Sequence, residues 1–392
     1  MHRIGALRAP VRPEVAPAGP AERGTTPVTP VAGPPPPRER WLDGLRAVAL
    51  VRVVLYHATG WGWLSLVFPS MGVMFALGGS LMVSSLRRTP AVDVVGHRIR
   101  RLLPPLWLFG LVAVGLMLAH GWTSDTGELA LSWPKLVFWV FPIMDPPGSL
   151  WGADFTVVLW YFRAYLWFVL LSPVLLRAFR RRPVVTVFAP LVFVAVDAVL
   201  GSPLTDSGPV GEGVLDFVTF GACWVLGFAH REGMLRRIHP AVLAGLFVAA
   251  VGLGAWWTAG HPLPDGRLDL NEIPLAQALI SAAAVLVFLR VSPRLAWLDR
   301  TPVLGRLVTL LNARAVTIFL WHNVAIDLSY PVDDWLGWSS QPVQLATSAV
   351  LTAGAVLAFG WVEDLAARRP PQLLPGARRK RPVSAPAVLP VA

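Results

Sequence analysis

Cysteine is nearly absent from this chain of 392 residues, which contains only Cys223. A single cysteine excludes an intramolecular disulfide and any metal site built from several thiolates. The eight histidines do not have the spacing of metal ligands either. We therefore expect no bound metal, and we expect the fold to be held together by helix packing.

Charged residues are also few. They make up 15% of the sequence against 55% hydrophobic residues, with a mean hydropathy of +0.57, a balance that water-soluble proteins rarely have. The formal net charge is +11, but the arginines fall in short groups between apolar runs rather than in one basic domain. This pattern indicates a membrane protein and argues against nucleic acid as a partner.

The first 40 residues lack an apolar run long enough for a signal peptide. They are rich in proline, alanine, glycine and arginine and include four consecutive prolines at 34–37. We predict a disordered cytoplasmic tail at 1–40, a transmembrane domain at 41–367 and a second disordered, basic cytoplasmic tail at 368–392.

Long apolar runs dominate the rest of the chain, and a membrane-spanning helix needs about 20 such residues. The runs that qualify lie near 41–59, 65–86, 103–120, 155–177, 184–200, 214–230, 240–259, 274–290, 314–331 and 344–366. A further stretch at 129–143 is shorter and contains Pro134 and Pro142, which predicts an interfacial or re-entrant segment. The expected fold is an all-α membrane bundle of about ten transmembrane helices.

The connecting segments alternate in charge. Arginine groups precede the first run and then follow every second run, at 38–40, 87–101, 177–182, 231–237, 290–314 and 368–381. The intervening segments carry aspartate and glutamate instead. Because cytoplasmic loops are enriched in lysine and arginine, this pattern predicts a multi-pass inner-membrane protein with both termini in the cytoplasm.

The first predicted helix contains Arg46 near its inner end and His57 eleven residues later. Eleven residues are about three turns, so the two side chains share one face about 16 Å apart along the axis. Histidine can act as a general base or nucleophile near neutral pH, and arginine suits phosphate or carboxylate. The alternative is that each side chain extends to its nearer membrane interface.

The segment 97–101 places several guanidinium groups where we expect the third helix to begin, with Pro104 in its first turn. Arg98 and Arg101 could hold phosphates there, or the cluster could anchor the helix by the positive-inside rule.

Inside predicted spans, where polar groups are costly and often functional, three further basic residues stand out. Arg163 lies about two turns from the outer face, and we predict that it binds substrate. His322 lies near mid-membrane, where it could serve the reaction or bond a neighbouring helix. Arg52 points away from the face shared by Arg46 and His57, so we expect it to have an acidic or carbonyl partner.

Together these segments resemble membrane-bound acyltransferase family 3 over roughly residues 38–366. The family pattern of a basic residue, ten residues and a histidine is matched by Arg46 and His57, and its Arg-x-x-Arg by Arg98 and Arg101. The segment ending at His322, Ile-Phe-Leu-Trp-His, is similar to the family's late aromatic-leucine-x-histidine motif. The second-helix segment 74–80 departs from the family pattern, having glycine where serine is usual, which leaves Gly79 as a close-packing position.

The resemblance implies an O-acyltransferase that moves an acyl group from cytoplasmic acyl-CoA, with acetyl-CoA the expected donor, to a hydroxyl of an envelope saccharide or another secreted acceptor. Arg98 and Arg101, helped by Arg46, would hold the donor's phosphates, and His57 would act as general base or carry the acyl group. No permanently bound cofactor is implied. We expect no appended extracytoplasmic domain, so acceptor specificity would reside in the bundle and the outer loops 121–153 and 261–273.

Two other classes of function fit the same sequence. A transporter or exporter of a saccharide or acylated compound would also carry scattered intramembrane charges, without doing chemistry. A purely structural membrane component would need another reason for its buried arginine and histidine. Transfer of label from acyl-CoA distinguishes the enzyme from both.

Overall fold

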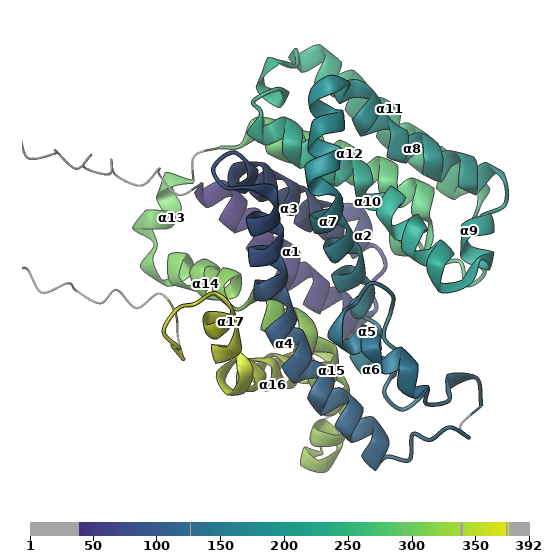
Figure 1. Ribbon diagram of the computed structural model, residues 1–392, viewed down its shortest axis with the longest axis vertical. Helices are drawn as coiled ribbons and strands as arrows, with labels where there is room; N and C mark the ends of the chain where they lie inside the picture. Colours follow the sequence, from purple (N-terminus) through teal and green to yellow (C-terminus); the bar gives the residue numbers. More distant parts are fainter. Residues whose placement is uncertain (1–38, 126, 294, 338–339, 374, 376–392) are drawn as a thin grey trace, which may run out of the picture. The chain divides into compact units, whose positions relative to one another are not determined.

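The computed structural model describes residues 39–125, 127–293, 295–337, 340–373 and 375 (Figure 1). Within these ranges all regular secondary structure is helical and no strand is present. The predicted all-α fold is therefore confirmed. The predicted tails at 1–40 and 368–392 lie mostly outside the described residues and stay predictions.

Every predicted apolar run overlaps one long helix. These helices are α1 (Arg40–Thr59), α3 (Ser70–Leu86), α4 (Ala91–Ala119), α7 (Leu159–Arg181), α8 (Pro183–Val199), α10 (Gly208–Arg231), α11 (Pro240–Gly260), α12 (Pro274–Val291), α15 (Ala315–Leu336) and α16 (Gln341–Phe359). Shorter helices join them: α2 (Leu64–Val67), α5 (Val137–Val140), α6 (Ala153–Thr156), α9 (Pro203–Asp206), α13 (Ala296–Arg300), α14 (Pro302–Ala313) and α17 (Trp361–Ala366).

Judged by helix length and composition, the structure has fewer candidate membrane spans than the sequence predicts. In the described part of the chain, seven helices are long and apolar enough, or eight if α14 and α15, which are bent by 84°, form one span. Two of the long helices fall short of this standard, because α8 has 17 residues and α1 contains four charged side chains. The expected count of about ten is thus not confirmed.

The stretch 129–143 forms no spanning helix. It contains two short 3-10 helices, Gly127–Leu129 at its start and Trp133–Leu136, followed by α5 with four residues. Its omission from the count of spans agrees with this structure.

Two predicted boundaries are wrong. Helix α4 begins at Ala91, so Arg98 and Arg101 lie in its second and third turns, and Pro104 is in its interior rather than its first turn. Buried Val94 and Leu102 show why, since the helix has a packed face well before its apolar run begins. The last predicted run, 344–366, is divided at Gly360 into α16 and α17.

Helices α3 and α10 pack with their backbones in close approach. A Cβ atom at Gly79 would collide with the carbonyl oxygen of Trp224, and one at Gly227 would collide with that of Ala76. Small residues permit such contacts between membrane helices. The prediction that Gly79 is a close-packing position is confirmed, and the pair of glycines fixes α3 against α10.

Candidate active site

His57 and His322 lie side by side, with their ring centroids 5.2 Å apart. They come from α1 and α15, which pack directly against each other. His322 is fully buried, whereas His57 near the end of α1 is half-buried. The two histidines that the sequence singled out separately therefore form one pair inside the bundle.

The hydrogen bonding of His322 fixes which ring nitrogen is available. Its Nδ1 lies 2.8 Å from the carbonyl oxygen of Phe319. A carbonyl only accepts, so Nδ1 carries the proton and Nε2 has a free lone pair. Nε2 is buried and has no hydrogen-bond partner among the described residues. Next to His57, this nitrogen is placed to accept a proton.

The three predicted phosphate-binding arginines are brought together from two helices. Arg101 on α4 is within electrostatic range of Arg98 and of Arg46 on α1. Arg98 donates a hydrogen bond of 3.4 Å to Ser85 Oγ. Within the described ranges no carboxylate forms an ion pair with any of the three. Like charges held together without a counterion favour binding of an anion.

Aromatic side chains connect this arginine cluster with the histidine pair. Arg46 acts electrostatically on Tyr161 of α7, whose ring lies 4.8 Å from that of Phe319. The Phe319 ring is in turn 5.8 Å from that of His322. Tyr165 lies 6.0 Å from Tyr161 and is within electrostatic range of Arg101. A continuous row of rings thus leads from the guanidinium groups to the histidines.

Arg52 has the carbonyl partner expected from the sequence. Its Nε donates to the backbone oxygen of Leu64 at 3.1 Å, and its guanidinium lies 4.9 Å from the centroid of the Tyr56 ring. The Tyr56 hydroxyl donates to Asp269 at 2.6 Å. Arg52 and Asp269 both act electrostatically on His57. These residues form a polar cluster at the C-terminal end of α1. The sequence singled out Arg52 but not Tyr56 or Asp269.

The loop that supplies Asp269 is held against α2, in the segment that connects α1 with α3. Ser65 donates to the carbonyl of Gly62 at 2.6 Å and accepts from the amide of Leu270 at 2.9 Å. Asp269 also accepts from the amide of Asn271 at 2.9 Å. This loop belongs to 261–273, the outer segment in which acceptor specificity is expected, and it lies beside His57.

Arg163 is not placed with the histidine pair. Its side chain is 2% exposed, and its two terminal nitrogens form ion pairs with Asp145 and Asp216. Burial raises the pKa of Asp145, and the charge of Arg163 lowers it in part. The pairs tie the segment before α6 to α7 and α10. Its role in substrate binding stays a prediction.

Arg314, the last residue of the arginine-rich connecting segment 290–314, is buried. It is 0% exposed and lies at the 84° bend between α14 and α15, where it donates to Asp364 at 2.7 Å. The amide and hydroxyl of Thr317 both donate to Glu363, at 2.7 and 2.6 Å. These bonds from α17 thus hold the first turn of α15 in place. They thereby set the direction of the helix that contains His322.

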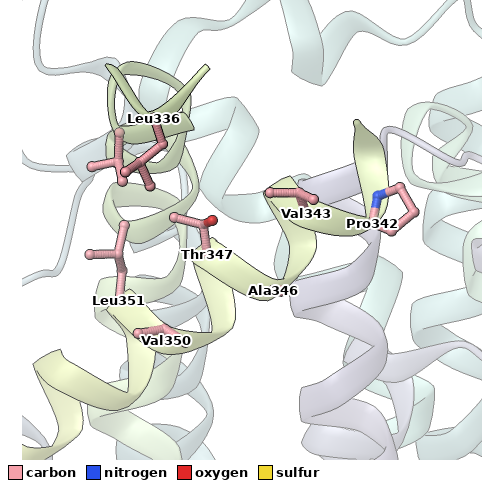
Figure 2. Close-up of a pocket in the computed structure, with 8 residues that line it drawn as sticks. Leu336, Pro342, Val343, Ala346, Thr347, Val350 and Leu351 are labelled. Carbon is pink, nitrogen blue, oxygen red and sulfur yellow. The ribbon is translucent and has the colours of Figure 1, made fainter. Parts of the chain in front are cut away.

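A separate apolar groove lies where α15 ends and α16 begins (Figure 2). Its volume is about 520 Å³, and its lining comprises Val332, Leu336, Pro342, Val343, Ala346, Thr347, Val350 and Leu351. No lining side chain titrates near neutral pH, so the groove has no acid–base group to offer. Across the described ranges no group of three histidine, cysteine, aspartate or glutamate residues is placed to hold a metal ion.

These features define a multi-pass helical membrane protein with a histidine pair between α1 and α15 and an arginine cluster formed by α1 and α4. Residues 39–362 match the model of acyltransferase family 3, described as an acyltransferase domain. The chain therefore belongs to this family, as the resemblance of its motifs indicated.

Among curated proteins, 104 residues are 38% identical to the "Putative membrane-bound transacylase BcsY" of Komagataeibacter xylinus. The match covers 25% of this chain and 25% of that protein. It therefore spans only a quarter of the relative's length. No solved structure matches the chain.

Proposed function

We propose that this protein is an integral membrane acyltransferase that uses cytoplasmic acyl-CoA, with acetyl-CoA the expected donor, to acylate a hydroxyl of an envelope saccharide or another secreted acceptor. The observation that carries the proposal is the contact between His57 and His322, because it places a free ring nitrogen beside a second histidine inside the bundle. Family membership and the transacylase relative support acyl transfer.

The donor binds with its phosphates at the arginine cluster. Arg98, Arg101 and Arg46 supply several charge-assisted hydrogen bonds to phosphate oxygens, for which guanidinium groups are well shaped. The pantetheine arm then lies along the rings of Tyr161 and Phe319, over the distance of about 16 Å between Arg46 and His57. This arrangement brings the thioester to a site that an acceptor enters from outside.

His57 acts as the general base. It takes the proton of the acceptor hydroxyl as that oxygen attacks the thioester carbonyl carbon. The new C–O bond forms, the C–S bond breaks, and the departing thiolate receives the proton from His57. His322 stabilises the protonated His57, since its Nε2 lone pair accepts a hydrogen bond from the charged ring. Arg52 and Asp269 hold the outer end of α1, and thereby His57, in place.

The protein lies in the inner membrane with both termini in the cytoplasm, on the charge asymmetry of its loops. Cysteine labelling tests this after buried Cys223 is replaced by alanine. Single cysteines at exposed Arg88 and exposed Asp265 should react from opposite sides of the membrane. Labelling of both from the same side would overturn the orientation.

Transfer of radioactive label tests the activity. Inverted membrane vesicles containing the protein and loaded with an extract of envelope acceptors are given labelled acetyl-CoA, and the label in the acceptor fraction is counted. Wild-type vesicles should transfer label, and vesicles with His57→Ala protein should not. If wild-type vesicles only redistribute an unmodified compound across the membrane, the transporter hypothesis replaces this proposal.

A further inference from the structure

The turn after α17 has an unusual residue at its key position. The amide of Arg369 donates to the carbonyl of Asp364 at 2.8 Å, and that of Arg368 donates to Leu365 at 2.9 Å. This pair of bonds ends a helix with one residue in the left-handed region, a position that glycine usually occupies. Here it is Arg368, with φ of 55°. The chain accepts a strained residue to turn sharply at this point.

Arg369 lies three residues after the end of α17, a helix that packs on α4. Arg369 is within electrostatic range of Arg101. Its one ion pair is a contact of 3.5 Å with Asp364. The carboxylate of Asp364 already accepts from Arg314 at 2.7 Å and from the amide of Gln372 at 3.1 Å. Arg369 is thus weakly held, and its side chain is half-exposed.

Arg369 extends a cluster that already has an excess of positive charge. Arg46, Arg98 and Arg101 have no carboxylate partner in the described part of the chain, and Asp364 is largely neutralised by Arg314. A fourth guanidinium within electrostatic range of Arg101 is unfavourable unless an anion of several charges binds among them. Arginine on a weakly bonded, exposed turn is free to complete such a site.

We propose that Arg369 is a fourth arginine of the donor site and binds a phosphate on the adenosine part of coenzyme A, with Arg368 shaping the turn that delivers it. The inference rests on the proposed function, because it takes acyl-CoA as the donor. Arg46, Arg98 and Arg101 lie on helices that continue toward the histidine pair, whereas Arg369 enters the cluster from the cytoplasmic turn. Arg369 is therefore placed to bind the adenosine end of the donor, which is farthest from the thioester.

The test measures binding of coenzyme A and of 4′-phosphopantetheine, which lacks the adenosine part, to the full-length protein in lipid nanodiscs by titration calorimetry. Arg369→Ala should weaken coenzyme A binding about tenfold, the size of one charge-assisted hydrogen bond, and leave 4′-phosphopantetheine binding unchanged. Arg369→Lys should fall between the wild type and Arg369→Ala.

Two control variants separate this role from bulk charge and from turn geometry. Arg180→Ala removes an arginine of similar exposure that is paired with Glu232, and it should leave coenzyme A binding unchanged. Arg368→Gly retains the turn, since glycine adopts positive φ readily, and should also bind normally. An equal loss in all three variants would mean a general charge effect and would overturn the inference.

Coenzyme A binding by the wild type distinguishes a failure of the role of Arg369 from a failure of the donor assignment. Equal affinity of Arg369→Ala and wild-type protein for coenzyme A would overturn the role of Arg369 alone. Absence of coenzyme A binding by the wild type would overturn the donor assignment itself, and the inference with it.

Discussion

The rings of His57 and His322 lie 5.2 Å apart although the two residues come from opposite ends of the sequence. One belongs to the helix that also carries Arg46, and the other has its Nδ1 proton committed to Phe319. The pair therefore joins a residue of the Arg46 helix to a histidine whose Nδ1 proton is held by a backbone carbonyl. A histidine positioned in this way is suited to act as a general base.

Replacing His57 should abolish transfer. We expect His57→Ala to lower label transfer by a factor of about a hundred or more, the usual contribution of a general base. Insertion should be retained, because the His57 side chain forms no hydrogen bond with another residue that the structure describes. His239→Ala serves as the control, since this exposed histidine caps the start of α11 and belongs neither to the histidine pair nor to the loops expected to bind the acceptor. Wild-type rates from well-inserted His57→Ala protein would refute the catalytic assignment.

His322 should show partial loss and strong coupling to His57. We expect His322→Ala to lower kcat about tenfold or more, because the protonated form of His57 loses its hydrogen-bond acceptor. The double variant should be hardly worse than His57→Ala alone, since residues that act as a unit are not additive. The measurement is a double-mutant cycle on transfer rates, and additive losses would show that the two rings act independently.

The arginine cluster should control use of the donor. Arg98→Ala and Arg101→Ala should each raise the KM for acyl-CoA about tenfold with a smaller effect on acceptor use, as expected for a lost charge-assisted hydrogen bond. Arg46→Lys should be milder than Arg46→Ala, because a positive charge remains. Arg88→Ala is the control, since this exposed residue bonds the carbonyl of Ser84. An unchanged KM for acyl-CoA in these variants would mean that the cluster only anchors the helix in the membrane.

The Tyr56–Asp269 bond should matter for the acceptor rather than the donor. Tyr56→Phe removes the hydroxyl and its bond of 2.6 Å without changing charge or shape, at a cost of about 1 kcal/mol. We expect the loosened outer loop to raise the KM for acceptor and leave the KM for acyl-CoA unchanged. Exposed Tyr330→Phe should change neither. A shift in the donor KM alone would contradict the placement of this loop on the acceptor side.

The glycine contact between α3 and α10 should be sensitive to a single methyl group. Gly79→Ala forces a Cβ into the backbone of Trp224, and such overpacking costs about 1–3 kcal/mol. Gly245→Ala on α11 meets nothing within 4 Å and should be neutral or slightly stabilising. Thermal unfolding of the two purified variants in detergent provides the comparison. Equal unfolding temperatures would mean that the two helices can move apart at no cost.

The sequence by itself determined the helical membrane fold, because hydrophobicity is a local property and each predicted apolar run is the core of a long helix. It also singled out Arg46, His57, Arg98, Arg101 and His322 as candidate site residues, since intramembrane charge and spacing are visible without a partner, and their roles stay predictions. It placed the start of α4 wrongly, because the packed face that extends this helix back to Ala91 depends on neighbours far away in the chain.

Only the tertiary structure decided which of these residues meet. The contact of His57 with His322 requires α1 to pack on α15, and the direction of α15 depends on the bend at buried Arg314. The partner of Tyr56 is supplied by a loop more than two hundred positions away. Arg163 acquires two carboxylates that no local pattern pairs with it. Local composition fixes where a helix forms, whereas side-chain packing across the bundle fixes which polar groups share a site.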